Sequence, residues 1–355
     1  MTLSVVQSVA SVAGEIAGRS VALQYTNVDA EYSALRRTAM LIDRSHRTRM
    51  TFGGDRRLET LTGLLTNDVG ALLPGAGQYA AALTPRGKII ADARLFARSS
   101  DVLVDVPARA AAGWTAMVRK YVNPRTTRYT DLSDTLADLG VFGVRSRDIV
   151  AMLTGLTTDA LAPLLPYANV TTEFDGHPIT VARVPDIGIE GYELIVSPTS
   201  RDELWQRATK LGAVPAGLDA WEIARIEAGR PEYGIDIDDG TIPQEANFDE
   251  LHAISYTKGC YTGQETVARV HFRGHVNRHL RGLLHPATAP LPRGAQLLDD
   301  NEKVVGDVRS SAISPRLGGI AIAMARREVL PGAAIRVRWD GGESVASVVL
   351  LPFPD

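Results

Sequence analysis

Cysteine is nearly absent from this sequence: Cys260 is the only one among 355 residues. A single thiol cannot close a disulfide within the chain, so nothing argues for an oxidising compartment, and we expect a reducing, cytoplasmic setting. The same scarcity excludes an iron–sulfur cluster held by this chain's own thiolates alone, because such clusters usually take four cysteine ligands.

The sequence also lacks an excess of charge of either sign. Lys and Arg number 38 against 41 Asp and Glu, a net charge of −3, so nucleic acid could be attracted only by a local patch. No apolar run approaches the length of a membrane span, and the first 17 residues lack the basic stretch and apolar block of a signal peptide. We therefore expect a soluble protein without membrane contact.

Several sequence signatures of enzymes are missing too. There is no phosphate loop, no dinucleotide-binding glycine fingerprint and no protease-type pattern around the cysteine. What the sequence does have is length and apolar content. Its 355 residues, 45% of them hydrophobic, suffice for two or three domains with cores of their own.

Helical and strand-like segments alternate in two similar blocks. Apolar residues at three- and four-residue spacing predict a helix from Asp55 through Leu65, and strict alternation predicts strands around it. The Gly-punctuated tail after Pro292 is typical of a small all-β domain, and the whole pattern indicates the α+β class. The predicted helices are 3–17, 32–38, 55–65, 108–122, 146–154, 201–211 and 218–228; the predicted strands are 48–52, 78–83, 89–96, 102–106, 139–144, 179–183 and 192–196, with 268–272 strand-like.

The most informative run extends from Lys258 to Arg269 and contains the only cysteine. Gly259 and Gly263 bracket Cys260, which suits a tight backbone path where a side chain would obstruct a ligand or a strand. Positive neighbours favour a reactive thiolate, whereas a free cysteine is also often a small buried hydrophobe. The residues alone leave both interpretations open.

The stretch from Lys258 to Arg281 is locally basic. Such a stretch could bind a small polyanion, a carboxylate tail or an RNA phosphate; the alternative is a charged surface that only contacts solvent. No series of aromatic residues that could stack on bases accompanies it. Histidines recur there every four residues, but the strand-like segment argues against a helical metal site, and we predict no metal. The cations are Lys258, Arg269, Arg273, Arg278 and Arg281 against Glu265, and the histidines are His271, His275 and His279.

Asp92 follows the turn at Gly87-Lys88 on a predicted strand. There its carboxylate could serve as an acid or base, or hold a cationic nitrogen; the alternative is an exposed carboxylate that aids solubility. The acid-rich stretch 236–240 lacks the loop spacing of a calcium site, so we predict a solvated loop there.

Residues Lys258-Gly259-Cys260-Tyr261-Thr262-Gly263-Gln264-Glu265 resemble the K-G-C-Y-x-G-Q-E signature of the folate-binding YgfZ proteins and their mitochondrial iron–sulfur assembly relatives. Further landmarks resemble those of the wider glycine-cleavage T-protein superfamily, and the similarity runs from about residue 30 to about residue 350. These landmarks are Asp43-Arg44-Ser45-His46, Thr66-Asn67-Asp68-Val69, Gly191-Tyr192-Glu193 and Arg225-Ile226-Glu227-Ala228-Gly229.

The resemblance implies a three-lobed, cloverleaf-like α+β fold, in which two ferredoxin-like lobes interleave along the chain and a C-terminal β-barrel closes the ring. It also implies that tetrahydrofolate or a derivative binds in the central cavity. The implied division is 1–50 and 135–217 for the first α+β lobe, 51–134 and 218–280 for the second, which carries the cysteine motif, and 281–355 for the barrel.

Two departures from the T-protein pattern bear on the site. The run from Gly87 to Asp92 keeps only the second of two adjacent acids, one of which is catalytic in the T-protein. The folate-contacting Gly-Glu-Asp-Gly run appears as Gly188-Ile189-Glu190-Gly191, so an isoleucine replaces the acid expected to hold the pteridine, unless Glu190 takes over. We predict Cys260 and Asp92 as catalytic residues. The predicted cofactor-binding residues are Lys258, Tyr261, Gln264, Glu265, Arg225, Tyr192, Glu193 and Glu190.

The resemblance favours a tetrahydrofolate-binding protein that assists assembly or repair of iron–sulfur proteins. Its partners would be iron–sulfur client or assembly proteins, with tRNA-modifying enzymes among the clients. The retained Asp92 supports an alternative, a folate-dependent aminomethyltransferase or related one-carbon transfer enzyme. A third interpretation is a folate- or RNA-binding module without catalysis, in which a tRNA contact would rest on no motif.

Overall fold

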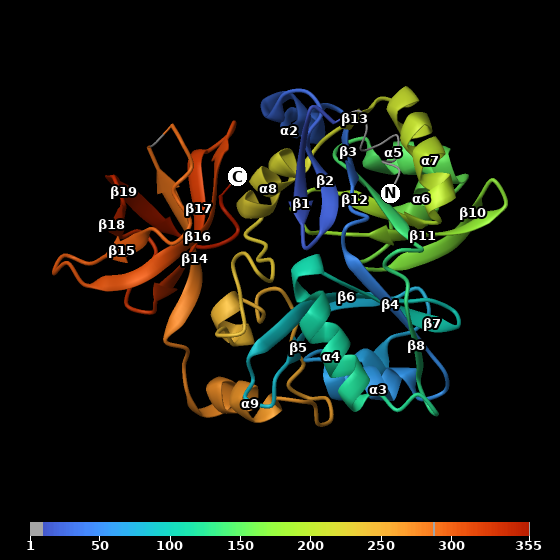
Figure 1. The fold of residues 1–355 in the computed structure, drawn as a ribbon, viewed down its shortest axis with the longest axis horizontal. Helices are drawn as coiled ribbons and strands as arrows, with labels where there is room; N and C mark the ends of the chain where they lie inside the picture. Colours follow the sequence, from blue (N-terminus) through green and yellow to red (C-terminus); the bar gives the residue numbers. More distant parts are fainter. Residues whose placement is uncertain (1–9, 287, 355) are drawn as a thin grey trace.

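The computed structural model describes residues 10–286 and 288–354, and these form three lobes around a common centre (Figure 1). Two lobes each combine one sheet with helices, and the third is a closed β-barrel. The predicted α+β class and the three-lobed, cloverleaf-like arrangement are confirmed. No helix among these residues is long and apolar enough to cross a membrane.

The first α+β lobe is built on a six-stranded sheet with the order β10-β11-β12-β9-β3-β13. Its helices cover one face, where a core of apolar side chains such as Leu139, Val181 and Trp205 is buried. Its strands are β3 (Ala39–Asp43), β9 (Ala137–Phe142), β10 (Asn169–Phe174), β11 (His177–Arg183), β12 (Gly191–Val196) and β13 (Ala213–Pro215), and its helices are α5 (Ser146–Thr154), α6 (Thr158–Leu161) and α7 (Pro198–Lys210).

The second α+β lobe has a five-stranded sheet with the order β5-β6-β7-β4-β8. Helices α3 and α4 cover its outer face and bury Phe52, Leu61 and Trp114 with their neighbours. Its elements are β4 (Thr48–Gly53), α3 (Arg57–Leu64), η1 (Val69–Ala71), β5 (Gly77–Leu83), β6 (Ile89–Ala97), β7 (Asp101–Val106), η2 (Ala108–Ala110), α4 (Ala111–Tyr121) and β8 (Arg128–Asp131).

The two α+β lobes interleave along the chain. Strand β3 belongs to the first sheet, the next strand, β4, belongs to the second, and the chain returns to the first sheet only at β9. The predicted interleaving is therefore confirmed at the level of the sheets. The exact residue boundaries of the three lobes stay a proposal.

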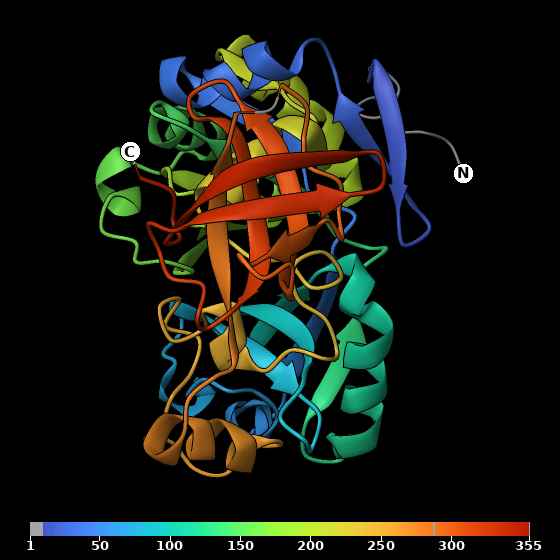
Figure 2. The same ribbon diagram turned by 90° about the vertical axis from the view of Figure 1, so that its left-hand side faces the viewer.

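The C-terminal barrel closes in the order β14-β17-β16-β15-β18-β19, as Figure 2 shows from its outer side. Alternate side chains fill its interior, including Leu283, Val308 and Val337. Its strands are β14 (Arg278–His285), β15 (Gln296–Leu298), β16 (Val304–Ser314), β17 (Gly318–Arg326), β18 (Ala334–Trp339) and β19 (Gly342–Val349).

The remaining elements join the lobes at the centre. A large core there takes side chains from all three lobes, among them Phe142, Trp221 and Met324. Helix α8 lies between the α+β lobes and the barrel (Figure 1). These elements are β1 (Val12–Ile16), β2 (Arg19–Gln24), α2 (Val28–Arg37), α8 (Leu218–Glu227), η3 (Pro243–Ala246) and α9 (Gln264–Arg273).

Two local predictions are wrong. The helix expected over 3–17 falls partly outside the described residues, and its described part forms the β1–β2 hairpin, in which Ala17 and Gly18 make the turn with positive φ. The strand-like segment 268–272 lies inside α9, because Gly263 adopts φ 83° just before Gln264 and starts a helix there. Only Val267 of this helix is buried, so its apolar pattern is too short to distinguish helix from strand.

Candidate functional site

A row of charged and aromatic side chains crosses the second sheet on its inner face. Tyr79 pairs directly with Arg94, Arg94 with Asp105, and Asp105 with Arg49, across β5, β6, β7 and β4. Residues opposite one another on neighbouring strands point to the same face, so the strand register alone lines them up. All four are almost fully buried.

Three guanidinium groups converge on the carboxylate of Asp105. Its Oδ1 lies 2.8 Å from Nη2 of Arg94 and 2.6 Å from Nε of Arg47, and its Oδ2 lies 3.0 Å from Nε of Arg49. Burial alone would raise the pKa of Asp105, but the charges of Arg47, Arg94 and Arg49 hold that pKa below its usual range. Asp105 is therefore a permanent anion that anchors the row.

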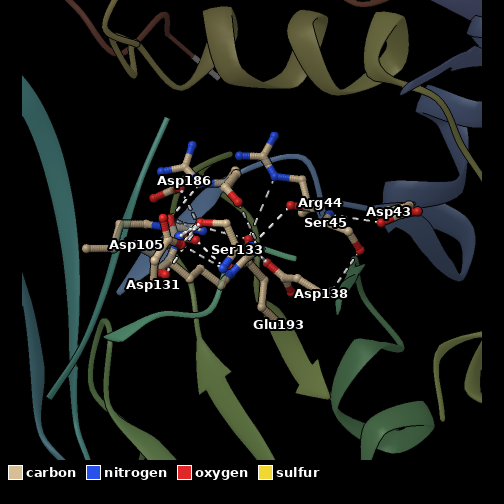
Figure 3. Close-up of polar contacts among 12 residues, drawn as sticks. Asp43, Arg44, Ser45, Asp105, Asp131, Ser133, Asp138, Asp186 and Glu193 are labelled. Atoms are coloured by element: carbon tan, nitrogen blue, oxygen red, sulfur yellow. Dashed lines mark hydrogen bonds and ion pairs between the residues drawn. The ribbon is translucent and has the colours of Figure 1, made fainter. Parts of the chain in front are cut away.

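The same arginines carry the network into the first lobe (Figure 3). Nη1 of Arg94 lies 2.8 Å from Glu193 and 3.1 Å from Asp186, and Nη2 of Arg49 lies 2.5 Å from Asp138. Burial and the neighbouring Glu193 raise the pKa of Asp138 well above its usual range. The surroundings of Asp138 therefore favour its protonated form.

A small cavity lies beside this network, between the two α+β lobes and α8. Its volume is about 10 Å³, room for the centre of one water molecule but not for a pteridine ring. The expected place for folate, the central cavity, is therefore filled by side chains in this structure. The lining residues are Arg44, Arg47, Tyr79, Asp92, Arg94, Asp186, Trp221, Arg225, Arg230, Pro231 and Glu232.

Asp92 lies in this cavity and is 4% exposed. Its Oδ2 accepts a hydrogen bond of 3.0 Å from the Tyr79 hydroxyl, and its Oδ1 accepts one of 3.1 Å from the backbone N–H of Tyr233. Burial raises the pKa of Asp92, although the charge of Arg47 opposes the shift. The alternative interpretation of Asp92 as an exposed, solubilising carboxylate is wrong, and its environment is that of a group that can take up or release a proton.

Arg225 and Arg230 close the cavity from the side of α8. Arg225 lies 2.6 Å from Asp236 and 2.7 Å from Glu222. The guanidinium of Arg230 lies 3.8 Å above the Tyr79 ring and donates to the Tyr167 hydroxyl. Asp236 is fully buried by its pairing with Arg225, so the prediction of a solvated loop over 236–240 is wrong at this residue.

A second, larger hollow adjoins the cavity on the surface. This groove has a volume of about 600 Å³ and lies between α2, the loop 187–189, the end of α8 and the C-terminal segment. Ile187, Ile189 and Phe353 give it an apolar wall, and Arg36 and Arg316 give it two cations that both lie near Glu227. Its size is that of a ligand pocket, and its residues fit an aromatic ring with an acidic tail.

The cysteine motif lies away from the cavity, on the loop before α9. The thiol of Cys260 is exposed, so its interpretation as a small buried hydrophobe is wrong. The ammonium of Lys258 donates to the carbonyls of Thr62 and Leu65, at the end of α3, and lies 4.4 Å above the Tyr261 ring. Lys258 thus caps a helix, and burial lowers its pKa to about 8.

The remaining predicted residues are spread over three places. Gln264 accepts a hydrogen bond of 3.1 Å from the backbone N–H of Tyr261, and Glu265 is exposed on α9. Burial raises the pKa of Tyr261 to about 12. Tyr192 is buried in the core on the helix side of the first sheet, and its hydroxyl donates 2.6 Å to Glu190, which pairs with Arg147 at 2.8 Å.

The structure therefore brings Asp92, Arg225 and Glu193 together and leaves the other predicted residues elsewhere. The cavity residues Arg47, Arg94 and Arg230 were not predicted from the sequence, and Arg44 appeared there only within a landmark. One signal could have found some of them: Asp92, Arg94 and Asp105 interrupt strands that are otherwise apolar. A charge in such a strand is buried unless the strand is at an edge, and a buried charge needs a partner.

The basic stretch is only partly available to a ligand. Lys258 caps α3, and Arg278 lies 3.0 Å from Glu245, which leaves Arg269 and Arg273 exposed on α9. His271 stacks on Tyr256 with ring centroids 3.6 Å apart. Over residues 10–286 and 288–354 no three His, Cys, Asp or Glu side chains gather in a way that could hold a metal ion.

Comparisons with known proteins agree with this architecture. Residues 4–255 match the GCVT N-terminal domain, and residues 278–355 match the glycine cleavage T-protein C-terminal barrel domain. The aminomethyltransferase of Saccharopolyspora erythraea is 31% identical over 96% of this chain and 93% of its own length. That of Nostoc sp. is 29% identical over 95% of this chain and 90% of its own length.

Among solved structures, the glycine cleavage system aminomethyltransferase T from Bartonella henselae superposes with a TM-score of 0.88 at 23% identity, covering 98% of this chain and 95% of that one. This match supports the fold. Proteins of this family bind tetrahydrofolate, in agreement with the predicted cofactor. The relatives are named aminomethyltransferases, so membership of the narrower YgfZ branch stays a proposal. By the two domain matches, which together span most of its length, this chain belongs to the glycine cleavage T-protein family.

Proposed function

We propose that this protein binds a tetrahydrofolate and transfers a one-carbon unit of the aminomethyl class, with Asp92 as the residue that handles the proton. The observation that carries the proposal is the environment of Asp92, a buried carboxylate with a raised pKa that lines a cavity between lobes. The names of the most similar relatives point to the same reaction class.

The surface groove is the proposed folate site. Its volume suits a drug-sized ligand, and its apolar wall suits a ring. Arg36 and Arg316 would take one carboxylate of the glutamate tail, because guanidinium groups bind carboxylates in a planar, two-bond geometry. Folate, when bound, would supply the acceptor nitrogen for the one-carbon unit.

Groove and cavity share the loop 186–189. Asp186 lines the cavity, whereas Ile187, Gly188 and Ile189 line the groove. The cavity is too small for a ring, so the reactive end of folate reaches Asp92 only if lining residues move. Gly188 has φ 70°, and glycine adopts this and other backbone conformations without strain. It is therefore the residue of this loop at which the backbone can move at least cost.

The test separates binding from chemistry. Asp92→Asn should bind tetrahydrofolate within about threefold of the wild type but lose about 10²–10⁴-fold in formation of methylenetetrahydrofolate from an aminomethyl donor. A protein that binds folate yet turns over no aminomethyl donor would overturn the transferase assignment. Arg316→Met should weaken folate binding without changing the protonation of Asp92.

The exposed thiol favours a second candidate, assembly or repair of iron–sulfur proteins in the manner of the YgfZ branch. Cys260 lies on a surface loop where a client protein can reach it. Cys260→Ser should then fail to restore the activity of iron–sulfur clients, tRNA-modifying enzymes included, in a strain lacking this protein. Full restoration would refute the role of the thiol, and a steep salt dependence of tRNA binding would instead favour an RNA-binding module.

A further inference from the structure

Arg44 is a buried cation that faces the central cavity. It follows β3 directly, its side chain is 2% exposed, and its backbone N–H donates a hydrogen bond of 2.8 Å to the carbonyl of Asp138. Its guanidinium lies 4.0 Å from the centre of the Trp221 ring, which covers one of its two faces. The edge of the guanidinium, which carries the N–H donors, is left for other partners.

No carboxylate makes a close, hydrogen-bonded ion pair with this charge in the described part of the chain. Over the part of the chain that the structure describes, the guanidinium of Arg44 makes no hydrogen bond, and only Glu193 lies within ion-pair distance, at 3.9 Å. That oxygen of Glu193 already accepts from Arg94 at 2.8 Å. Burial and the nearby charge of Arg47 lower the pKa of Arg44, so the surroundings oppose its charge instead of balancing it.

Arg47 also faces this cavity, and only some of its guanidinium N–H donors have hydrogen-bond partners. Its one side-chain hydrogen bond among the described residues runs from Nε to Asp105 at 2.6 Å, and its terminal nitrogens are unused. Two other cavity arginines differ, because Arg94 reaches three carboxylates and Arg225 reaches two. A buried cation without a close partner is costly, so Arg44, with the unused terminal nitrogens of Arg47 at the same cavity, indicates a missing anion.

We propose that the central cavity binds a single small carboxylate group, held by Arg44 and Arg47 beside Asp92. A planar carboxylate matches the forked donors of a guanidinium better than a spherical anion does. The cavity, at about 10 Å³, has room for the centre of one water molecule, so a carboxylate group enters as the lining side chains move apart, and a ring would need far more space. The site is thus distinct from the groove proposed for the pteridine and does not depend on folate binding there.

Two sources of the carboxylate share this chemistry: a free acid as small as formate, or the end of a folate glutamate tail. Sodium formate at about 50 mM should raise the Tm of the wild type by about 2 °C over the same concentration of sodium chloride. Arg44→Met should lose this shift, and Arg44→Lys, which keeps the charge but not the fork, should bind formate about tenfold more weakly. Arg119→Met, which removes an exposed arginine on α4, should keep the full shift.

Competition then assigns the source. If tetrahydrofolate displaces ¹³C-formate but tetrahydropteroate, which lacks the glutamate, does not, the carboxylate belongs to the folate tail. If formate and tetrahydrofolate bind to the protein at the same time, the carboxylate in the cavity belongs to a separate small acid. Either result supports the anion site. No formate-dependent shift in the wild type, a shift of equal size with chloride, or an unchanged shift in a folded Arg44→Met protein would overturn it, whatever the outcome of the transferase assay.

Discussion

Arg49 lies beside both Asp105 and Asp138, and burial raises the pKa of both carboxyl groups, yet their neighbours shift the two pKa values in opposite directions overall. Asp105 faces three guanidinium groups and stays ionised, whereas Asp138 faces Arg49 and the carboxylate of Glu193 and holds a proton. An amide resembles a protonated carboxyl group but not a carboxylate. The same substitution should therefore have very different costs at the two positions.

We expect Asp105→Asn to lower the free energy of unfolding by about 3–5 kcal/mol, because it leaves three buried guanidinium groups without their shared anion. Asp138→Asn should stay within about 1 kcal/mol of the wild type, since its amide oxygen can accept from Arg49 and its NH₂ can donate to Glu193. Urea denaturation at neutral pH measures both. Equal losses would contradict a protonated Asp138.

The pH dependence follows from the same proton. The folded-state pKa of Asp138 is raised, so its contribution to stability is fully present below the unfolded value of about 3.9 and is lost as pH rises through the folded pKa. As pH rises above about 4, the urea midpoint of unfolding of the wild type should fall by more than that of Asp138→Asn. A variant with the wild-type pH profile would show that this group does not titrate in that range.

Arg44 and Arg94 provide a matched test of buried charge. Arg94→Met should cost about 3–5 kcal/mol, because it leaves the buried Glu193 without a close cation and takes one of three guanidinium groups from Asp105. Arg44→Met breaks no close ion pair and should leave the unfolding free energy unchanged or raise it by up to about 2 kcal/mol. Urea denaturation in a buffer without carboxylates measures both variants. A large loss of unfolding free energy in Arg44→Met would mean that Arg44 has a stabilising partner within the folded protein.

At this scale the sequence predicted part of the site. Asp92 and Arg225 were identified from the sequence and line the cavity, because a strand position and a motif were enough to single them out. Arg44 appeared only as part of a landmark. Its lack of a partner depends on Trp221, Glu193 and Arg94, which come from distant segments, so no local pattern could indicate it.

At the scale of elements, the loop before α9 is held by a contact between two turns. Gly263 has φ 83°, and a Cβ there would lie 2.5 Å from the carbonyl oxygen of Thr84. Gly259, on the other side of the thiol, has no atom within 4 Å of its would-be Cβ. Of the two glycines that bracket Cys260, only one is required by the fold.

Gly263→Ala should therefore lower stability by about 2 kcal/mol or more, from left-handed strain and the clash with the β5–β6 turn. Gly259→Ala should remain within about 0.5 kcal/mol of the wild type. Thermal unfolding of the two variants, with Cys260 alkylation as a check that the thiol stays exposed, makes the comparison. A greater loss in Gly259→Ala would mean that the loop is ordered differently.

Longer elements with a clear apolar period were predictable, and short ones were not. Helix α8 and strands β5 to β7 occur where their patterns placed them. Strand β13 has three residues and exists because it pairs in parallel with β3, far away in the sequence. A segment that short carries no period of its own, so its structure is decided by tertiary contacts.

At the scale of the molecule, Glu227 joins three parts at the end of α8. Its carboxylate accepts from the Tyr32 hydroxyl of α2 at 2.7 Å and from the Ser314 hydroxyl of the barrel, and Arg36 and Arg316 flank it. Glu227→Ala should cost about 2–4 kcal/mol and loosen the barrel from the α+β lobes. In this variant the amide hydrogen-exchange rate should rise in β16 and β17 before it rises in β3 or β9. An equal rise in all four strands would contradict this prediction.

The three-lobed arrangement itself came from the resemblance and not from the residue patterns, which showed only two tandem blocks and a β tail. Interleaving cannot be read from periodicity, because β3 and β4 look alike as strands and differ only in the sheet they join. The choice between sheets is made by the ion pairs and apolar contacts of distant segments.

Interleaving also fixes the order in which the two sheets can form during synthesis of the chain. When β3 leaves the ribosome, its neighbours β9 and β13 have not yet been made. Every strand of the second sheet lies between β3 and β9 in the chain and is therefore made first. Roughly 90 residues separate β3 from β9, which at about 5–20 residues per second is a delay of roughly 5–20 s. During that interval the largely apolar strand β3 stays unpaired beside a lobe that can already fold, which makes the nascent chain a natural client for chaperones.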